Sequence, residues 1–201
     1  IMFNETTHAL TIGKVKSNGI WIFWRSTLAE QFADSLDSFF RYLSLDNTGT
    51  YLNGYMVADA KTGEIGLAEM SWRCFAFYRS SGGPYTVQTV CSDGGPASTV
   101  YDTELVNPSY IIGVNFPASQ QIQDDLKPVD TKMARRSQFL QLLPSVSDIE
   151  TAKAVITYTD PSNPLSIYGR WDLGYGQTIA PKQVPSGSVD AKAATAGMVR
   201  S

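Results

Sequence analysis

The amide side chain of Asn115 stands at a point in the sequence where it could take part in chemistry. It ends the apolar stretch over residues 109–114, and Phe116-Pro117 stops a strand directly behind it. An amide that projects from a strand end into a cleft can donate a hydrogen bond to a developing oxyanion. The alternative is that Asn115 caps the turn through its own backbone, and the residues alone favour that reading.

Two arginines and a second asparagine are further candidates. Arg135 and Arg136 fall inside a helical pattern with Met133 and Leu140. One guanidinium can therefore face solvent, while the other would lie along the sheet-facing side and need a carboxylate or carbonyl partner. A plain surface pair explains the sequence equally well. Asn53 precedes an apolar run, where its alternative role is a hydrogen bond that closes the start of a strand.

The residues needed for other common chemistries are few. His8 is the single histidine, and Cys74 and Cys91 are the two cysteines, so a zinc site of the usual ligand count is excluded and we expect no metal or cofactor. No serine sits in a Gly-x-Ser-x-Gly elbow, which argues against a Ser-His-Asp triad. The two cysteines could form a disulfide across neighbouring strands or stay as small buried thiols, and we favour the buried thiols.

The bulk composition limits the class of protein. The chain has 201 residues, 43% of them hydrophobic, which suits one domain over 1–201 with a loop-rich tail over 180–201. A net charge of −3 gives no overall basic footprint for nucleic acid or anionic lipid. The longest apolar runs fall far short of the roughly 20 residues of a membrane span. Asp124 and Asp125, like Asp34 and Asp37, are interpreted as solvated charges on or near helices.

Hydrophobic periodicity predicts an α+β fold. A helix is expected over residues 27–44, opened by a capping box of Thr27 and Glu30. The pattern then changes to strands, with a hairpin turn at Gly63. The other expected elements are strands over 51–59, 64–72, 74–79, 85–90 and 109–117, a loop over 91–108, and helices over about 131–143 and 147–157, the last with a Ser147/Glu150 capping box.

Six stretches occur in an order that is seen in one known group of proteins. They are "ETTHALT", "NTGTYLNGYMVADAKTGEI", "IIGVNFP", "ARRSQFLQLL", "IYGRWDLGYG" and "SGSVDAKAA", which together span nearly the whole chain. In these stretches the chain resembles the phospholipase B-like proteins and their bacterial relatives in the autoproteolytic acyltransferase and hydrolase group. The resemblance implies the αββα sandwich of the N-terminal nucleophile (Ntn) hydrolases, in which a cysteine uses its own α-amino group as general base.

The same resemblance implies roles for particular residues. "GVNFP" resembles a segment of the related bile-salt and penicillin V acylases and implies that Asn115 is an oxyanion donor. "MARRSQF" resembles their active-site arginine segment, which points to Arg135 first and to Arg136 second, as a binding residue. Asn53 matches the second asparagine of a "GTYNNQWM" type of pattern, and the resemblance implies that it lies near the cleft and positions its neighbours.

One departure from the family pattern matters more than these matches. The family's N-terminal cysteine lies well upstream of the "ETT" segment, and neither Cys74 nor Cys91 occupies that position. We therefore interpret the chain as the C-terminal portion of an Ntn-type hydrolase, with an incomplete sandwich and no nucleophile of its own. By itself it is expected to be inactive. The reaction that the resemblance implies is cleavage or transfer at a small-molecule amide or acyl substrate.

The alternative is a non-catalytic module that keeps the fold and binds a ligand or a partner chain. In both cases exposed sheet edges and apolar surface favour pairing with the missing N-terminal segment or with a second copy, as a dimer. The resemblance favours an extracytoplasmic location, although the residues themselves leave the compartment open.

Overall fold

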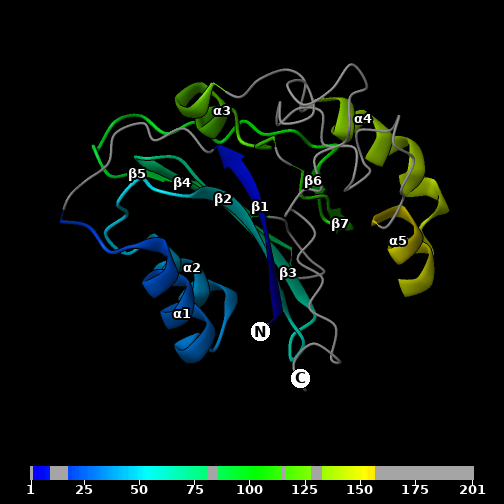
Figure 1. The fold of residues 1–201 in the computed structure, drawn as a ribbon, viewed down its shortest axis with the longest axis horizontal. Coiled ribbons are helices and arrows are strands. Elements are labelled where there is room, and N and C mark those ends of the chain that lie inside the picture. The colour runs from blue at the N-terminus through cyan, green and yellow to red at the C-terminus, as the bar shows by residue number, and fades with distance from the viewer. Residues whose placement is uncertain (1, 10–17, 81–85, 115, 128–132, 157–201) are drawn as a thin grey trace, which may run out of the picture. The chain divides into compact units, whose positions relative to one another are not determined.

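The computed structural model describes residues 2–9, 18–80, 86–114, 116–127 and 133–156 (Figure 1). The chain divides into two compact units, Ile1–Val129 and Asp130–Ser201. The first holds an antiparallel sheet with flanking helices, and the second holds helices, so the expected α+β class is confirmed. The expected single domain stays a prediction, and the tail over 180–201 lies outside the described residues.

The described part of the first unit is built on a five-stranded antiparallel sheet. Its strands are β1 (Met2–Ala9), β2 (Leu52–Asp59), β3 (Glu64–Met70), β4 (Cys74–Ser80) and β5 (Thr86–Cys91), hydrogen-bonded in that order. Alternation and turn residues correctly predict β2 to β5, including the positive φ of 73° at Gly63. The periodicity did not predict β1, which pairs with β2 across the long stretch that contains two helices.

The two faces of this sheet pack against different layers. Val57 and Gly66 are opposite each other on the face covered by the helices α1 (Ile22–Phe32) and α2 (Leu36–Ser44), which we call the α1–α2 face. A Cβ on Gly66 would lie 2.7 Å from the ring of Phe40, so α2 lies close against the strands. Met56 and Tyr78 lie on the other side, the α3 face, where Met56 approaches Gly113 and Tyr78 contacts the ring of Tyr101.

The single helix expected over residues 27–44 is wrong, because the chain forms two helices there. Ser35 caps α2: its hydroxyl accepts from the backbone N–H of Ser38, and the Ser38 hydroxyl accepts from the N–H of Ser35. These local bonds compete with a continuous helix. The expected Thr27/Glu30 box is also wrong, since the Thr27 hydroxyl donates to the carbonyl of Phe23 inside α1.

The core lies between α1, α2 and the sheet, and it contains a buried cation. The guanidinium of Arg25 donates to the carbonyls of Ile20 and Leu43 and to Oδ1 of Asn47, at 3.0 Å for Ile20 and 2.8 Å for Asn47. Burial lowers the pKa of Arg25 to about 10. The apolar residues of this core are Ile22, Ala29, Leu36, Phe39, Phe40, Leu43, Leu52, Tyr55, Val57, Ala68, Met70 and Phe75.

A smaller layer covers the α3 face. It comprises the short strands β6 (Val106–Asn107) and β7 (Tyr110–Ile111) and the helix α3 (Gln120–Leu126). The strand expected over 109–117 is therefore too long. The side chain of Asn107 accepts from the backbone of Ser109 and Tyr110 and closes a tight hairpin, after which the chain leaves the ladder. The periodicity did not predict α3.

The described part of the second unit contains α4 (Met133–Leu142), the 3₁₀ turn η2 (Leu143–Ser145) and α5 (Ile149–Ile156). Both expected helices are confirmed within these bounds. The cap of α5 differs from the expected one, because Oδ1 of Asp148 accepts from the N–H of Thr151 and the Thr151 hydroxyl accepts from the N–H of Asp148. None of the helices in the described ranges combines the length and apolarity of a membrane-spanning helix.

The close contact at Gly66 gives a test of how α2 seats on the sheet. We expect Gly66→Ala to lower the free energy of unfolding by about 1–3 kcal/mol, because the new methyl group overlaps the Phe40 ring. Phe40→Leu removes the ring atoms that the new methyl group would overlap. Gly66→Ala should therefore lower the free energy of unfolding less in the Phe40→Leu background than in the unaltered protein. Urea titrations of the four proteins measure this coupling, and strictly additive effects would contradict the packing.

Candidate functional site

The described residues on either side of Asn115 lie over the α3 face. Asn115 itself lies outside the described residues, but Val114 and Ala118 on either side of it are buried. The backbone N–H groups of Ala118 and Ser119 donate to the two carboxylate oxygens of Glu69, each at 2.8 Å. The residues that follow Asn115 are thus held on the middle of the sheet by one side chain of β3.

Glu69 is a buried acid in an otherwise apolar stretch of strand, with only 2% of its surface exposed. Burial raises the pKa of Glu69 to about 7, against the opposing effect of the two N–H donors. The hydroxyl of Tyr78 lies 3.5 Å from Glu69, and the charge of Asp102 raises the pKa further. Glu69 was not among the predicted site residues, although a lone charged residue inside a strand is a signal for a buried polar contact.

Asn53 lies on the other side of the sheet. It is fully buried in β2, and alternation along the strand places it on the α1–α2 face with Tyr55 and Val57. Its paired residue on β1 is Thr7. The sheet therefore lies between Asn53 and the segment that carries Asn115, and a role for Asn53 in the same cleft stays a prediction.

The two candidate arginines lie in the second unit. Arg135 and Arg136 both fall within α4, and Arg136 is half-buried. The side chain of Arg135 lies outside what the structure describes. Because each unit is described by itself, the expected approach of Arg135 to Asn115 stays a prediction.

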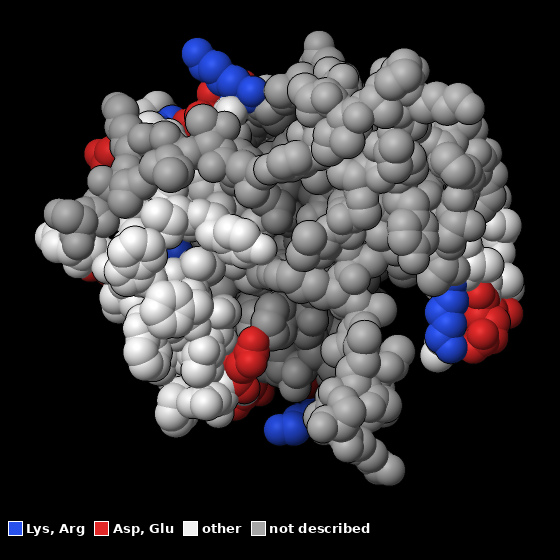
Figure 2. Space-filling view, in the orientation of Figure 1, with Lys and Arg blue, Asp and Glu red and all other residues white. Residues whose placement is uncertain are grey.

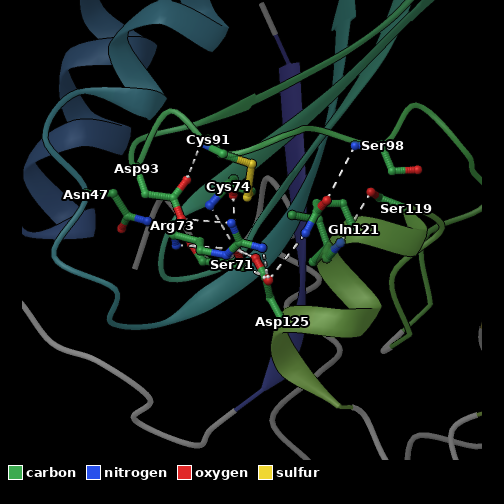
Figure 3. Close-up of a disulfide and its surroundings, with 12 residues drawn as sticks. Asn47, Ser71, Arg73, Cys74, Cys91, Asp93, Ser98, Ser119, Gln121 and Asp125 are labelled. Carbon is green, nitrogen blue, oxygen red and sulfur yellow. Dashed lines mark hydrogen bonds and ion pairs between the residues drawn. A yellow bond between two sulfur atoms is a disulfide. The ribbon is translucent and has the colours of Figure 1, made fainter.

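A polar cluster ties α3 to the turn between β3 and β4 (Figure 3). Nε of Arg73 lies 2.9 Å from Oδ1 of Asp125, and Nη1 of Arg73 lies 2.9 Å from Oδ2 of Asp93. The hydroxyl of Ser71 donates to the second oxygen of Asp125. The hydrogen bond to Asp125 has the largest effect in raising the pKa of Arg73, and the hydrogen bond to Asp93 raises it further. The interpretation of Asp125 as a solvated charge is wrong, since its side chain is nearly buried.

A disulfide lies beside this cluster. Cys74 and Cys91 are directly opposite each other on β4 and β5 and are joined through their sulfur atoms, with their Cα atoms 4.1 Å apart. The preference for two buried thiols was therefore wrong, and the disulfide alternative is confirmed. The disulfide joins β4 and β5 next to Asp93, whose carboxylate accepts a hydrogen bond from Arg73. The backbone N–H of Gly95 has the largest effect in lowering the pKa of Asp93, and the hydrogen bond from Arg73 lowers it further.

Glu69 and the Arg73 cluster are arranged to anchor the chain to the sheet. Glu69 is enclosed, and both of its oxygens already accept backbone N–H bonds, so it holds the chain rather than a substrate. Arg73 has two carboxylate partners. Within the described ranges, no group of three or more His, Cys, Asp or Glu side chains could hold a metal ion. The two anchors fix both ends of α3 and the chain that leads into it.

Comparison with known proteins does not identify the chain. No protein-family model matches it, and no curated protein matches it. The roles of Asn115, Arg135, Arg136 and Asn53 therefore depend on the resemblance of the six quoted stretches, and they stay predictions.

The raised pKa of Glu69 makes stability depend on pH in a defined window. The folded state binds the proton more tightly than the unfolded chain does, so this contribution is complete below pH 4.5 and is lost as the pH rises through about 7. We expect the contribution to amount to on the order of 3 kcal/mol. In Glu69→Gln the slope of unfolding free energy against pH between these values should disappear.

Urea unfolding from pH 4 to 8 measures this dependence. Glu30→Gln is the control, because Glu30 is exposed on α1 and the pH profile should match that of the unaltered protein. Equal slopes in Glu69→Gln and the unaltered protein would contradict the buried acid.

The disulfide gives a second stability test. We expect Cys74→Ala/Cys91→Ala to lose roughly 3 kcal/mol of unfolding free energy, the scale for a closed loop of this size. Adding a reductant should destabilise the unaltered protein by a similar amount and leave the double variant unchanged. Two free thiols in the denatured, unreduced protein would show that the bond does not form.

Proposed function

We propose that the chain is the C-terminal part of an Ntn-type amide hydrolase or acyltransferase of the phospholipase B-like kind, whose nucleophilic cysteine lies upstream. The observation that carries this proposal is the ordered set of six family-like stretches along nearly the whole chain. Two of these stretches supply β1 and β2, which pair as antiparallel neighbours with Thr7 opposite Asn53. Thr7 and Asn53, which are 46 residues apart in sequence, thus become neighbours in one sheet, as segments of a shared fold would.

The proposed reaction divides the work between two parts of the complete protein. The upstream cysteine attacks the carbonyl carbon of a small-molecule amide or acyl substrate, and its own α-amino group takes the thiol proton. The amine leaves with a proton, and water then hydrolyses the thioester. Asn115 would donate a hydrogen bond to the oxyanion formed at each attack, and Arg135 would be the second catalytic residue. Arg136 would bind the substrate, and Asn53 would position its neighbours in the cleft.

The arrangement of the first unit supports a shared scaffold for such a site. Glu69 holds Ala118 and Ser119, and the Arg73 cluster holds the far end of α3, so the chain that follows Asn115 is fixed to the sheet at two points. Such fixing is what an oxyanion donor needs, because its geometry must be set before the charge develops. In the described residues β1 has one sheet neighbour, so its other edge can accept upstream strands of the proposed αββα sandwich.

The disulfide supports the expected extracytoplasmic location. Disulfides persist in oxidising compartments and are rare in reducing ones. Cys74 and Cys91 are the only cysteines of the chain and both are used in this bond.

The second candidate is a non-catalytic module that binds a partner. Four aromatic side chains of α1 and its cap are more than half exposed, which favours a contact surface. The missing N-terminal segment or a second copy of the chain are the partners that this reading implies.

The proposal is tested on the complete reading frame. Mass spectrometry should find two fragments, the later one beginning with Cys, and the complete protein should hydrolyse N-acyl amides, whereas the chain described here should not. We expect Asn115→Ala to lower kcat/KM by roughly 10²–10³-fold, the scale for one oxyanion donor. Asn107→Ala is the matched control, because Asn107 closes the neighbouring hairpin through its own backbone contacts.

Two results would overturn the proposal. An intact single chain that still hydrolyses amides would remove the autoproteolytic mechanism. Unchanged turnover in Asn115→Ala would return this residue to a turn-capping role.

A further inference from the structure

Strand β5 forms one edge of the described sheet (Figure 1), and its ladder with β4 shows which of its backbone groups face outward. In an antiparallel pair, hydrogen-bonded and non-hydrogen-bonded positions alternate along the strands. The N–H of Ser92 donates to the carbonyl of Arg73 at 2.8 Å, so these two residues occupy a hydrogen-bonded position. Cys74 and Cys91 are the next pair, and their Cα spacing of 4.1 Å is that of a non-hydrogen-bonded position.

Counting back along β5 from Cys91 identifies the outward residues. Thr89 and Val87 lie two and four residues before Cys91 and share its non-hydrogen-bonded position, so their N–H and C=O groups project from the sheet edge. Among the described residues, no hydrogen bond uses these four groups. The carbonyl of Cys91, by contrast, already accepts from the N–H of Gly94. The edge that can accept a new strand is therefore the backbone of Val87 and Thr89.

Strand β5 lacks the features by which edge strands avoid further pairing, which are charged side chains, proline and bulges. Residues 80–92 contain no Asp, Glu, Lys or Arg, and β5 itself contains no proline. Its register with β4 continues without a shift. Gln88 and Val90 are exposed, Val90 by 48%, so the strand is accessible from the α1–α2 face. An edge of this kind is a template for another strand.

The residue pattern of β5 fits an antiparallel copy of itself. Gln88 is at the centre of the Thr-Val-Gln-Thr-Val stretch over 86–90, with Val87 and Thr89 on either side. When Gln88 faces Gln88 of a second copy across a two-fold axis, Val87 of each copy lies opposite Thr89 of the other. These are the two residues whose backbone groups point outward, so each pair can exchange both of its hydrogen bonds. This register satisfies all four outward groups of each strand.

We propose that β5 pairs with β5 of a second copy of the chain, as an antiparallel ladder centred on Gln88. The two described five-stranded sheets then become one continuous sheet across the two-fold axis. β-Branched residues meet across the new ladder, since Val87 lies opposite Thr89, and such residues favour sheet pairing. The pairing does not depend on the proposed hydrolase.

Two features favour a second copy over a peptide of another sequence. The uncharged stretch over 80–92 brings no like charges together when two copies meet at β5, and the two-fold register uses every outward group. A foreign peptide would be selected by side-chain pockets beside the edge, whereas Gln88 and Val90 are exposed there. An edge-to-edge contact buries less area than a standard interface, so we expect a dimer that dissociates on dilution.

The oligomeric state of the full chain tests this pairing. Sedimentation velocity over a range of protein concentrations should show a monomer–dimer equilibrium. Thr89→Pro removes an outward N–H without removing a bond to β4, so it should weaken the dimer roughly tenfold. The circular dichroism and the unfolding midpoint of this variant should stay close to those of the unaltered chain, which confirms that it folds.

Charge exchange at the centre of the ladder tests the register. Gln88 is exposed, so Gln88→Lys and Gln88→Glu should both fold. Each variant places like charges directly opposite one another and should weaken its own dimer roughly fivefold. A mixture of the two variants places opposite charges there and should dimerise more strongly than either variant alone.

Cross-linking tests the same register by distance. Gln88→Cys should form a disulfide-linked dimer under mild oxidation, because the two copies of this residue are directly opposite each other. Val90→Cys should not, because the two copies of residue 90 would be about 14 Å apart along the strands. Equal linking in both variants would contradict the proposed ladder.

A matched control separates β5 from the other exposed apolar surface. Trp24 on α1 is exposed by 58%. The described surface over α1 and α2, at the lower left of Figure 2, is mostly uncharged. Trp24→Lys introduces on that surface the same charge that Gln88→Lys introduces on β5, and it should leave the dimer unchanged.

Three further results would overturn the proposal. The first is a monomer at every concentration of the unaltered chain. The second is a dimer that Trp24→Lys dissociates and Gln88→Lys leaves intact, which would locate the contact on α1. The third is a mixture of Gln88→Lys and Gln88→Glu that dimerises no better than either variant alone.

Discussion

The enclosed carboxyl group of Glu69 is the constraint on which the arrangement of the α3 face depends. A buried acid must have its oxygens satisfied, and here two consecutive backbone N–H groups at the start of α3 do so. A helix of seven residues has little stability of its own, so α3 stays in place because Glu69 holds its start and Arg73 holds Asp125 near its end. The location of the chain after Asn115 follows from these two anchors.

The sheet also separates the candidate residues. Asn53 faces the apolar core under α1 and α2, while the segment around Asn115 lies over the opposite face. In a shared site these two asparagines would therefore play different parts, one within the scaffold and one at the reacting surface. Arg135 and Arg136 belong to the second unit.

Local signals and long-range contacts were not equally visible in the sequence. Strands β2 to β5 were predictable, because alternation and the turn at Gly63 are local. The break before α2 was missed, because Phe32 and Leu36 continue a helical spacing while the caps at Ser35 and Ser38 interrupt it. The burial of Asp125 was invisible for another reason, since its partner Arg73 lies 52 residues away in the sequence. The partners of Glu69 lie 49 and 50 residues away.

The pairing of β1 with β2 has a consequence for how the chain folds. The meander from β2 to β5 closes through short turns, so its contacts can form early and locally. By contrast, β1 reaches β2 only after the stretch between Ala9 and Leu52, which contains both helices, has closed, and this step carries the entropy cost of a long loop. β1 should therefore join after the meander has formed, onto strands that are already paired.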